Sequence, residues 1–231
     1  APAQINVPRD YWTQVIDIEL PPIVRFERQG GGKEAIENAA KLLSKAKFPV
    51  ILSGAGVVLG GAIDECKKLA EKLDAPVCNG YQHNDSFPGS HPLAVGPLGY
   101  NGSKAAMELI SKADVVLALG TRLNPFSTLP GYGIDYWPKN ATIIQVDMNP
   151  DRIGLTKKVS VGICGDAKQV AQQILDKLSS DAGNTGREDR KNLIHKTKSA
   201  WLQTLSGLDH EEDDPGTVWN KEARERDKDR M

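Results

Sequence analysis

A glycine-rich segment follows the apolar run of residues 49–52, and it is the first feature of the chain with a possible chemical role. Residues 53–61 read Ser-Gly-Ala-Gly-Val-Val-Leu-Gly-Gly. Glycines between a strand and a helix let the backbone approach a phosphate, and the start of the helix offers N–H groups to an anion. The spacing is one residue longer than the dinucleotide pattern Gly-x-Gly-x-x-Gly. Gly54 and Gly56 are therefore candidate cofactor-binding residues, and a tight strand-to-helix turn explains them equally well.

Two aspartates that follow apolar runs are further candidates for such a site. Asp147 ends the run of residues 142–146, a position where an acid often binds a ribose hydroxyl. A turn or cap formed with Asn149 ahead of a proline explains Asp147 equally well. Asp166 follows residues 159–164 and precedes a helical pattern, so the N-cap of a helix is favoured there over a ligand contact.

Arg122 and a long loop supply the candidate substrate-binding residues. Arg122 follows the apolar run of residues 115–119, and its planar guanidinium suits a phosphate, carboxylate or sulfonate. An internal ion pair is the alternative for this residue. Residues 79–102 are too long and too rich in glycine, aromatic, histidine and amide groups for a mere connector, and they could reach into a neighbouring active site. The candidate residues of this loop are His83, Tyr100 and Asn101.

Neither the histidines nor the cysteines predict a metal site. His83 and His91 have no third ligand at a usual spacing. Cys66, Cys78 and Cys164 form no Cys-x-x-Cys pair and lie in apolar segments, which favours reduced, structural thiols of a cytoplasmic protein. Cys78, at the end of an apolar run, is the one candidate for a reactive thiol.

Helices and strands alternate along the middle of the chain, and they must position these residues. Helices are expected over residues 33–45, 62–73, 103–111 and 166–178, and strands over residues 49–52, 75–78, 115–119, 142–146 and 159–164. The predicted fold class is α/β, with a Rossmann-like parallel sheet flanked by helices. Ligands of such sheets bind at the carboxyl ends of the strands, where the glycines and polar candidates lie.

Charge is unevenly distributed, although the whole chain is nearly neutral. The 29 basic and 30 acidic residues argue against a nucleic-acid or membrane partner, and no apolar run reaches the length of a membrane span. Residues 181–231 hold 12 acidic and 10 basic residues, which predicts a charged linker with a short helix over residues 191–205. Residues 4–8 resemble an edge strand that needs a partner in an upstream domain.

Six stretches of the chain resemble the central region of thiamine diphosphate-dependent enzymes of the acetolactate synthase type. They are residues 4–8, 50–56, 96–102, 114–122, 144–147 and 165–167. The resemblance implies the end of a pyrimidine-binding domain and a linker over residues 1–32, the central domain over 33–180, and a linker toward a diphosphate-binding domain over 181–231. Thiamine diphosphate and Mg²⁺ would be bound mainly outside this chain, which by itself would be inactive. A homodimer or homotetramer is implied for the full-length protein.

Within this superfamily, the chain resembles the sulfoacetaldehyde acetyltransferases more than the acetolactate synthases. The stretches that carry this resemblance are residues 8–12, 79–101 and 209–219. These enzymes make acetyl phosphate and sulfite from sulfoacetaldehyde and phosphate. Asn124-Pro125 stands where acetolactate synthases commonly carry an acidic pair, which argues against that activity and against an FAD site. The alternatives are an acetolactate synthase-like 2-oxo-acid enzyme, a stand-alone nucleotide-binding domain, and a domain of that fold whose site has become empty.

Overall fold

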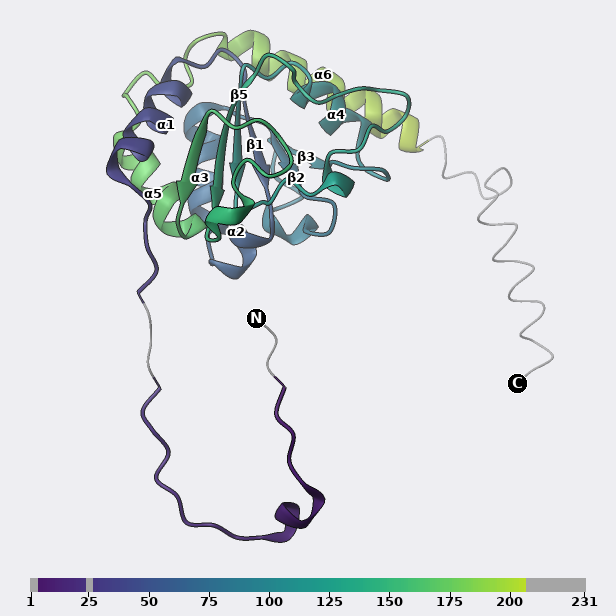
Figure 1. Ribbon diagram of the computed structural model, residues 1–231. Helices are drawn as coiled ribbons and strands as arrows, with labels where there is room; N and C mark the ends of the chain where they lie inside the picture. The colour runs from purple at the N-terminus through teal and green to yellow at the C-terminus, as the bar shows by residue number, and fades with distance from the viewer. Residues whose placement is uncertain (1–3, 24–26, 207–231) are drawn as a thin grey trace, which may run out of the picture.

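The computed structural model describes residues 4–23 and 27–206, and Figure 1 shows their arrangement. A six-stranded sheet forms the centre, and every neighbouring pair of its strands is parallel. The strand order β3-β2-β1-β4-β5-β6 confirms the expected α/β fold with a Rossmann-like sheet. The strands are β1 (Pro49–Ser53), β2 (Val77–Asn79), β3 (Ala94–Pro97), β4 (Val115–Leu119), β5 (Thr142–Asp147) and β6 (Val161–Cys164).

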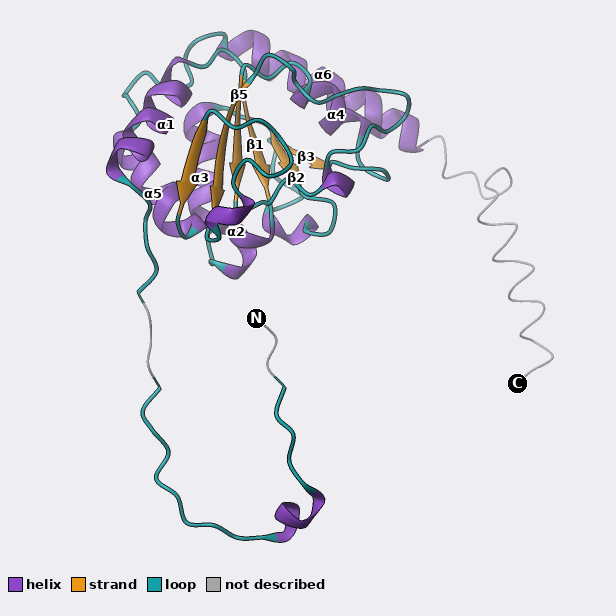
Figure 2. Cartoon of the chain, in the orientation of Figure 1, coloured by secondary structure: helices purple, strands orange, loops and turns teal. Residues whose placement is uncertain are grey.

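Helices lie around this sheet, as Figure 2 shows. The central strands β1 and β4 are buried at every position, which requires cover on both faces. One group of helices packs together and consists of α1 (Lys33–Lys45), α3 (Ile63–Leu73) and α5 (Ala167–Lys177). A second group consists of α4 (Lys104–Ile110) and α6 (Arg187–Ser206). Helix α1 buries Ile36, Ala39, Ala40 and Leu43, which lie at the i, i+3, i+4, i+7 spacing of one helical face.

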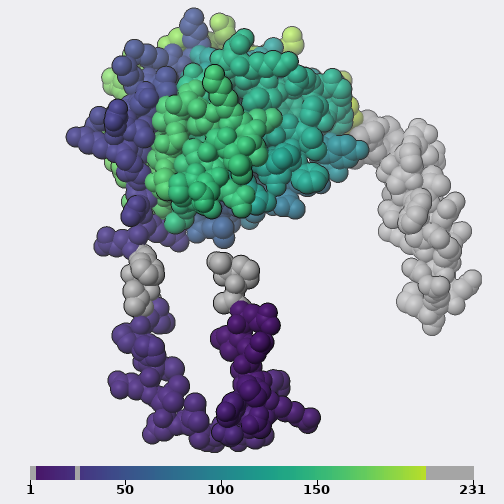
Figure 3. Space-filling view, in the orientation of Figure 1, coloured from purple at the N-terminus to yellow at the C-terminus, as the bar shows by residue number. Residues whose placement is uncertain are grey.

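Shorter helices occur in the connections. They are η1 (Arg9–Thr13), α2 (Ala55–Leu59), η2 (Asn84–Ser86), η3 (Pro125–Ser127) and η4 (Pro150–Arg152). Residues 120–141, between β4 and β5, contain η3 and form no α-helix. Figure 3 shows the segment from β4 to β6, teal to green, as a continuous surface across the front of the domain.

Strand β3 lies inside the segment that the sequence predicted to be a loop. It pairs with β2, and the register shifts between Val77 and Cys78. The strand contains Gly96 at φ +92 and ends at Pro97. Such residues are uncommon inside strands and more typical of edges and bulges, so the local pattern concealed this edge strand.

The edge strand expected over residues 4–8 is not formed. These residues are exposed coil and lead into η1, whose residues are also exposed. The described part of the chain offers them no neighbouring strand, and a β-strand requires a hydrogen-bonded partner.

Helix α6 extends the folded body past residue 180, where charge density suggested that a linker begins. Arg190, Ile194 and Thr197 are buried along one side of the helix, which packs against α4. The helix expected over residues 191–205 is therefore longer and is partly packed. The charged run of residues 210–216 lies outside the described residues. Within residues 4–23 and 27–206, no helix has the length and hydropathy that a bilayer span requires.

Candidate functional site

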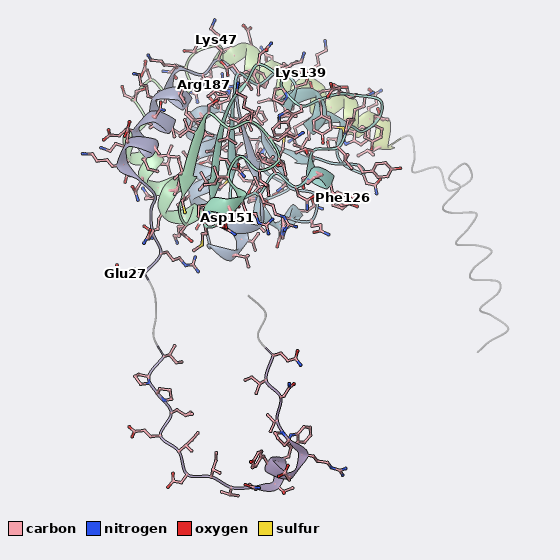
Figure 4. All side chains as sticks on the ribbon, in the orientation of Figure 1. Glu27, Lys47, Phe126, Lys139, Asp151 and Arg187 are labelled. Atoms are coloured by element: carbon pink, nitrogen blue, oxygen red, sulfur yellow. The ribbon has the colours of Figure 1, made fainter. Side chains whose placement is uncertain are left out.

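A cleft of about 910 Å³ opens at the edge of the sheet where the strands end. Its walls come from the segments that follow β1, β2, β4, β5 and β6, together with Arg28 from the segment before α1. Figure 4 places Phe126, which lines the cleft, at this edge, and Lys47 and Arg187 at the opposite edge. The position agrees with the general location of ligand sites in open parallel sheets.

Six glycines line the cleft, and each donates its backbone N–H to a carbonyl oxygen of the protein. The six N···O distances lie between 2.8 and 3.1 Å. The bonds run from Gly54 to Leu119, Gly56 to Gly120, Gly60 to Gly56, Gly80 to Ser53, Gly120 to Val146 and Gly165 to Asp147. These N–H groups are therefore engaged within the protein rather than presented to a phosphate.

Gly54 and Gly56 have a packing role that explains their residue type. A Cβ atom on Gly54 would lie 2.6 Å from Cβ of Thr121, and one on Gly56 would lie 2.7 Å from Cα of Gly120. The turn after β1 thus crosses the turn after β4 at a distance that only glycine permits. This is the tight strand-to-helix turn, and a nucleotide contact of these glycines stays a prediction.

Asp147 lines the cleft and also forms a turn. Its Oδ1 accepts a hydrogen bond of 2.8 Å from the backbone N–H of Asn149. Oδ1 of Asn149 accepts one of 3.0 Å from the N–H of Asp151. The turn expected from the Asp-x-Asn-Pro pattern is therefore present, and a ribose contact by Asp147 stays a prediction.

Asp166 is the N-cap of α5, as its position in the sequence predicted. Its Oδ1 accepts from the N–H groups of Lys168 and Gln169 at 3.1 and 3.2 Å. Its Oδ2 accepts from Nη1 of Arg28 at 3.0 Å, and the side chain is only 1% exposed. Both carboxylate oxygens are thus engaged in holding the fold together.

Arg28 is a cleft residue that sequence reasoning missed. It contacts Asp166, 138 positions away in the chain, and no local pattern marks such a pair. The neighbouring residue also contacts Asp166, because the carbonyl oxygen of Gln29 accepts a hydrogen bond of 2.8 Å from the backbone N–H of Asp166. Only the tertiary structure brings this arginine to the cleft.

Arg122 and His83 both line the cleft, as their assignment as substrate-binding candidates requires. Arg122 is exposed, and no carboxylate in residues 4–23 or 27–206 pairs with it, so the alternative of an internal ion pair is not found there. Nδ1 of His83 lies 3.8 Å from Oδ1 of Asp85. The structure thus brings together two candidates that are distant in sequence.

Tyr100 and Asn101 do not line the cleft. The side chain of Tyr100 is 68% exposed, and Asn101 is exposed as well. The preceding Gly99 has φ +105, and a Cβ on it would lie 2.4 Å from the carbonyl oxygen of Phe126. These two candidates therefore belong to the outer surface of the domain.

Histidine and acidic side chains do not form a metal centre in the part of the chain that the structure describes. No group of three His, Cys, Asp or Glu side chains is suitably placed there. His91 lies away from the cleft, where Nδ1 accepts from the N–H of Leu93 and Nε2 lies 3.2 Å from Glu71. Its environment indicates a structural role.

The three thiols divide into two kinds. Burial raises the pKa of Cys66 from 9.0 to about 12, and it raises the pKa of Cys78 still further. Cys78 is therefore a poor nucleophile, contrary to the possibility that its place at a strand end suggested. Cys164 lies on the edge strand β6 and is exposed, although the residues around it in the sequence are apolar.

Comparisons with known proteins agree with this architecture. Residues 36–174 match the family model described as "Thiamine pyrophosphate enzyme, central domain". A relative from Rhizobium meliloti (strain 1021), named "Probable sulfoacetaldehyde acetyltransferase", is 78% identical over 231 residues, which is 100% of this chain and 39% of the relative. A "Sulfoacetaldehyde acetyltransferase" from Roseovarius nubinhibens is 76% identical over 97% of this chain and 37% of the relative.

A solved structure supports the fold alone. The benzoylformate decarboxylase from Polynucleobacter necessarius superposes with a TM-score of 0.59 at 21% identity, covering 77% of this chain and 33% of that one. The chain spans less than two fifths of the length of the Rhizobium meliloti and Roseovarius nubinhibens relatives, 39% and 37% respectively. The family match covers most of the described body. The chain therefore belongs to the thiamine pyrophosphate enzymes, of which it contains the central domain.

Proposed function

We propose that this chain is the central part of a longer acetyltransferase that converts sulfoacetaldehyde and phosphate to acetyl phosphate and sulfite. The observation that carries the proposal is the 78% identity along the whole chain to a relative named for that activity. The alignment with this relative covers the whole chain and therefore includes the loop of residues 79–101, which borders the cleft. We place the enzyme in the cytoplasm, in keeping with its cysteines, which form no disulfide in the structure.

The flanks of the chain fit a position between two further domains. Residues 4–23 are exposed throughout and carry apolar side chains that nothing in the described structure covers. A preceding pyrimidine-binding domain, ending in residues 1–32, would bury them. The chain after α6 would lead to a diphosphate-binding domain. Two or four such polypeptides would assemble as a homodimer or homotetramer.

The residues present do not fit thiamine diphosphate with Mg²⁺. A Mg²⁺ site needs carboxylate or carbonyl oxygens that are free to bind the ion. Within the described residues no acidic group of that kind is assembled, and both oxygens of Asp166 are engaged. The cofactor and its metal would therefore be held by the flanking domains, and no catalytic step is assigned to this chain.

Within this proposal the central domain contributes scaffold and anion recognition. Arg122 and His83 face the cleft and are the proposed substrate-binding residues. Tyr100 and Asn101 lie on the outer surface, where they would act only against a neighbouring domain or subunit.

The test uses the longer polypeptide that contains this chain with both flanking domains. Supplied with thiamine diphosphate, Mg²⁺, sulfoacetaldehyde and phosphate, it should release sulfite and acetyl phosphate in equal amounts. Both products are measured, and pyruvate is offered separately. Conversion of pyruvate to acetolactate without sulfite release would overturn the proposal in favour of an acetolactate synthase-like enzyme.

A further inference from the structure

We propose that an uncharged aromatic patch on the folded body binds a second copy of this chain. The patch contains the side chains of Tyr100, Phe126, Leu129, Tyr132, Leu202 and Leu205. The proposal rests on the assembly of two or four polypeptides that the proposed function includes, and it names the surface through which two of them meet. It requires no catalytic step.

Exposed apolar side chains are concentrated in this patch. Nine large apolar side chains are exposed among residues 27–206, and six of them belong to the patch, with exposed fractions between 38% and 68%. The other three are Leu59, Met148 and Leu155, which lie in other segments. Single exposed residues of this kind are normal on a protein surface, whereas a group of six indicates a partner.

Three segments that are far apart in the sequence contact one another and make the patch continuous. The hydroxyl of Tyr132 donates to the carbonyl oxygen of Gly102 at 3.1 Å. The ring of Tyr132 packs edge-on against Trp201 of α6, with 5.7 Å between the ring centroids. Gly99 lies against the carbonyl oxygen of Phe126, where a Cβ atom would clash. Figure 1 shows the loop between β4 and β5, in teal, next to the last turns of α6.

These three segments carry no charge. Residues 98–103, 123–134 and 199–206 contain no Asp, Glu, Lys or Arg, although 26% of the residues of the whole chain are charged. Leu202 and Leu205 follow Trp201 in the last of these segments, at the end of α6. Depletion of charged residues together with an excess of aromatic ones is typical of the centre of a protein interface.

Tyr132 holds an unfavourable backbone conformation within the patch. Its φ of +52 lies in the left-handed region, which a bulky residue rarely adopts and a glycine adopts easily. The side chain nevertheless remains 57% exposed. A strained residue whose ring is more than half exposed indicates a role beyond the packing of its own domain.

The size and the neutrality of the patch fit a second copy. With roughly 150–250 Å² for each large side chain, the exposed fractions amount to on the order of 600 Å². That area approaches the ~800 Å² that each partner contributes to a standard interface. A two-fold axis would place the same uncharged surface on both sides, so that apolar groups meet apolar groups. The formal net charge of −1 leaves little repulsion between two copies.

The patch also borders the cleft, because Phe126 belongs to both. A second copy bound to the patch would therefore lie next to the mouth of the cleft. Tyr100 does not line the cleft of its own chain. In the assembly its ring would instead contact the neighbouring copy.

Sedimentation equilibrium of the 231-residue chain at increasing concentration measures this association directly. We expect an equilibrium between monomer and dimer, because an interface with a two-fold axis is closed. Tyr100→Lys and Leu202→Lys, from two different segments of the patch, should each weaken dimerisation by about tenfold or more, since each would bury an unpaired ammonium group. Both side chains are exposed in the single chain, so circular dichroism should remain that of the folded protein.

Two control variants carry the same substitution outside the patch. Leu155→Lys is the matched control, because Leu155 is 62% exposed and Leu202 is 60% exposed. Trp12→Lys tests residues 4–23, the other exposed apolar part of the described chain. Each control should change the dissociation constant of the dimer by less than about twofold, as is usual for a surface substitution outside an interface.

The proposal is overturned if the chain remains monomeric at every concentration, or if both patch variants dimerise as the original chain does. Equal weakening by Trp12→Lys would assign the interface to the N-terminal segment and would also overturn it. A monomer whose melting temperature falls in both patch variants would mean that another part of the same chain covers the patch, against the proposal. None of these results involves sulfite release, so failure of the proposed enzyme activity would be recognised separately.

Discussion

The residues around the cleft show how the same residue type can serve a fold or a ligand. Gly54 and Gly56 permit two turns to cross, and their N–H groups are bound to carbonyl oxygens of the protein. Asp166 caps a helix and holds an arginine. Arg122 differs from them, because no group in the described chain pairs with its charge. A charged side chain is therefore a candidate for ligand binding when no group of the described chain forms an ion pair or hydrogen bond with it.

The environments of the thiols lead to a prediction on their reactivity. At pH 8, a thiol reagent should modify Cys164 rapidly in the folded chain and leave Cys66 and Cys78 unmodified, because only Cys164 is exposed. All three should react after unfolding in guanidinium chloride, as mass spectrometry of the labelled protein would show. Rapid labelling of Cys78 in the folded state would contradict its burial.

The same thiols predict how stability changes at alkaline pH. Because burial raises the pKa of Cys66 from 9.0 to about 12, the folded state retains a proton that the unfolded state loses above pH 9. The buried thiol therefore adds no pH dependence to stability below its unfolded pKa of 9.0, and it lowers stability by about 1.4 kcal/mol per pH unit as pH rises from 9 toward 12.

Among the elements, α6 shows how a charged segment can be part of a core. Arg190 is 1% exposed and donates all five of its guanidinium N–H groups to carbonyl oxygens, at distances from 2.6 to 2.9 Å. These carbonyls belong to Lys47, Leu73, Asp74, Gly183 and Thr185. Burial lowers the pKa of Arg190, and the nearby Asp74 carboxylate opposes that effect. The helix is thereby joined to the end of α3.

Substitution of this arginine should therefore be costly. Arg190→Met removes the donor from five carbonyl oxygens, three of them in buried hydrogen bonds, so we expect a loss of about 3 kcal/mol or more in the free energy of unfolding. Lys191→Met is the control on the same helix, since its exposed pair with Glu188 spans 3.9 Å and should contribute less than about 1 kcal/mol. Urea denaturation measures both variants. A loss below about 1 kcal/mol for Arg190→Met would show that α6 is not held by this contact.

Considered as a whole, the described chain consists of a folded body and an exposed N-terminal segment. Figure 1 shows residues 4–23 as an extended loop outside the folded body. Their side-chain hydrogen bonds are local, such as the one from the indole N–H of Trp12 to the carbonyl oxygen of Val7. Contact with the body begins at Arg28, through Asp166 and Leu59. The body should therefore fold without the residues that precede Arg28.

Two truncations test this division. Removal of residues 1–26 should leave the melting temperature within about 1 °C of the original, because the described part of this segment, residues 4–23, is exposed throughout. Removal of residues 1–31 also deletes Arg28 and leaves the buried Asp166 without a cation, which should lower the melting temperature by about 5 °C. Differential scanning calorimetry compares the two. Equal losses in both truncations would mean that residues 1–26 contribute to the body.

The fold class and most of the helices and strands were predictable from the sequence alone. The apolar spacing of residues 33–45 and the continuous apolar run of residues 115–119 reappear with the same bounds as α1 and β4. Such patterns are local, because the periodicity of a helix or a buried strand depends on neighbours a few positions away. For the same reason the N-cap role of Asp166 was predictable from its position before the helix.

Which residues contact one another could be known only from the packing of the elements. Strand β3 forms because β2 offers it a partner, and the strand expected over residues 4–8 is absent because the described chain offers none. Arg28 lines the cleft and Tyr100 does not, and no short sequence pattern encodes this difference. Contacts between residues more than a hundred positions apart depend on how whole elements pack, and that is the information a linear pattern does not contain.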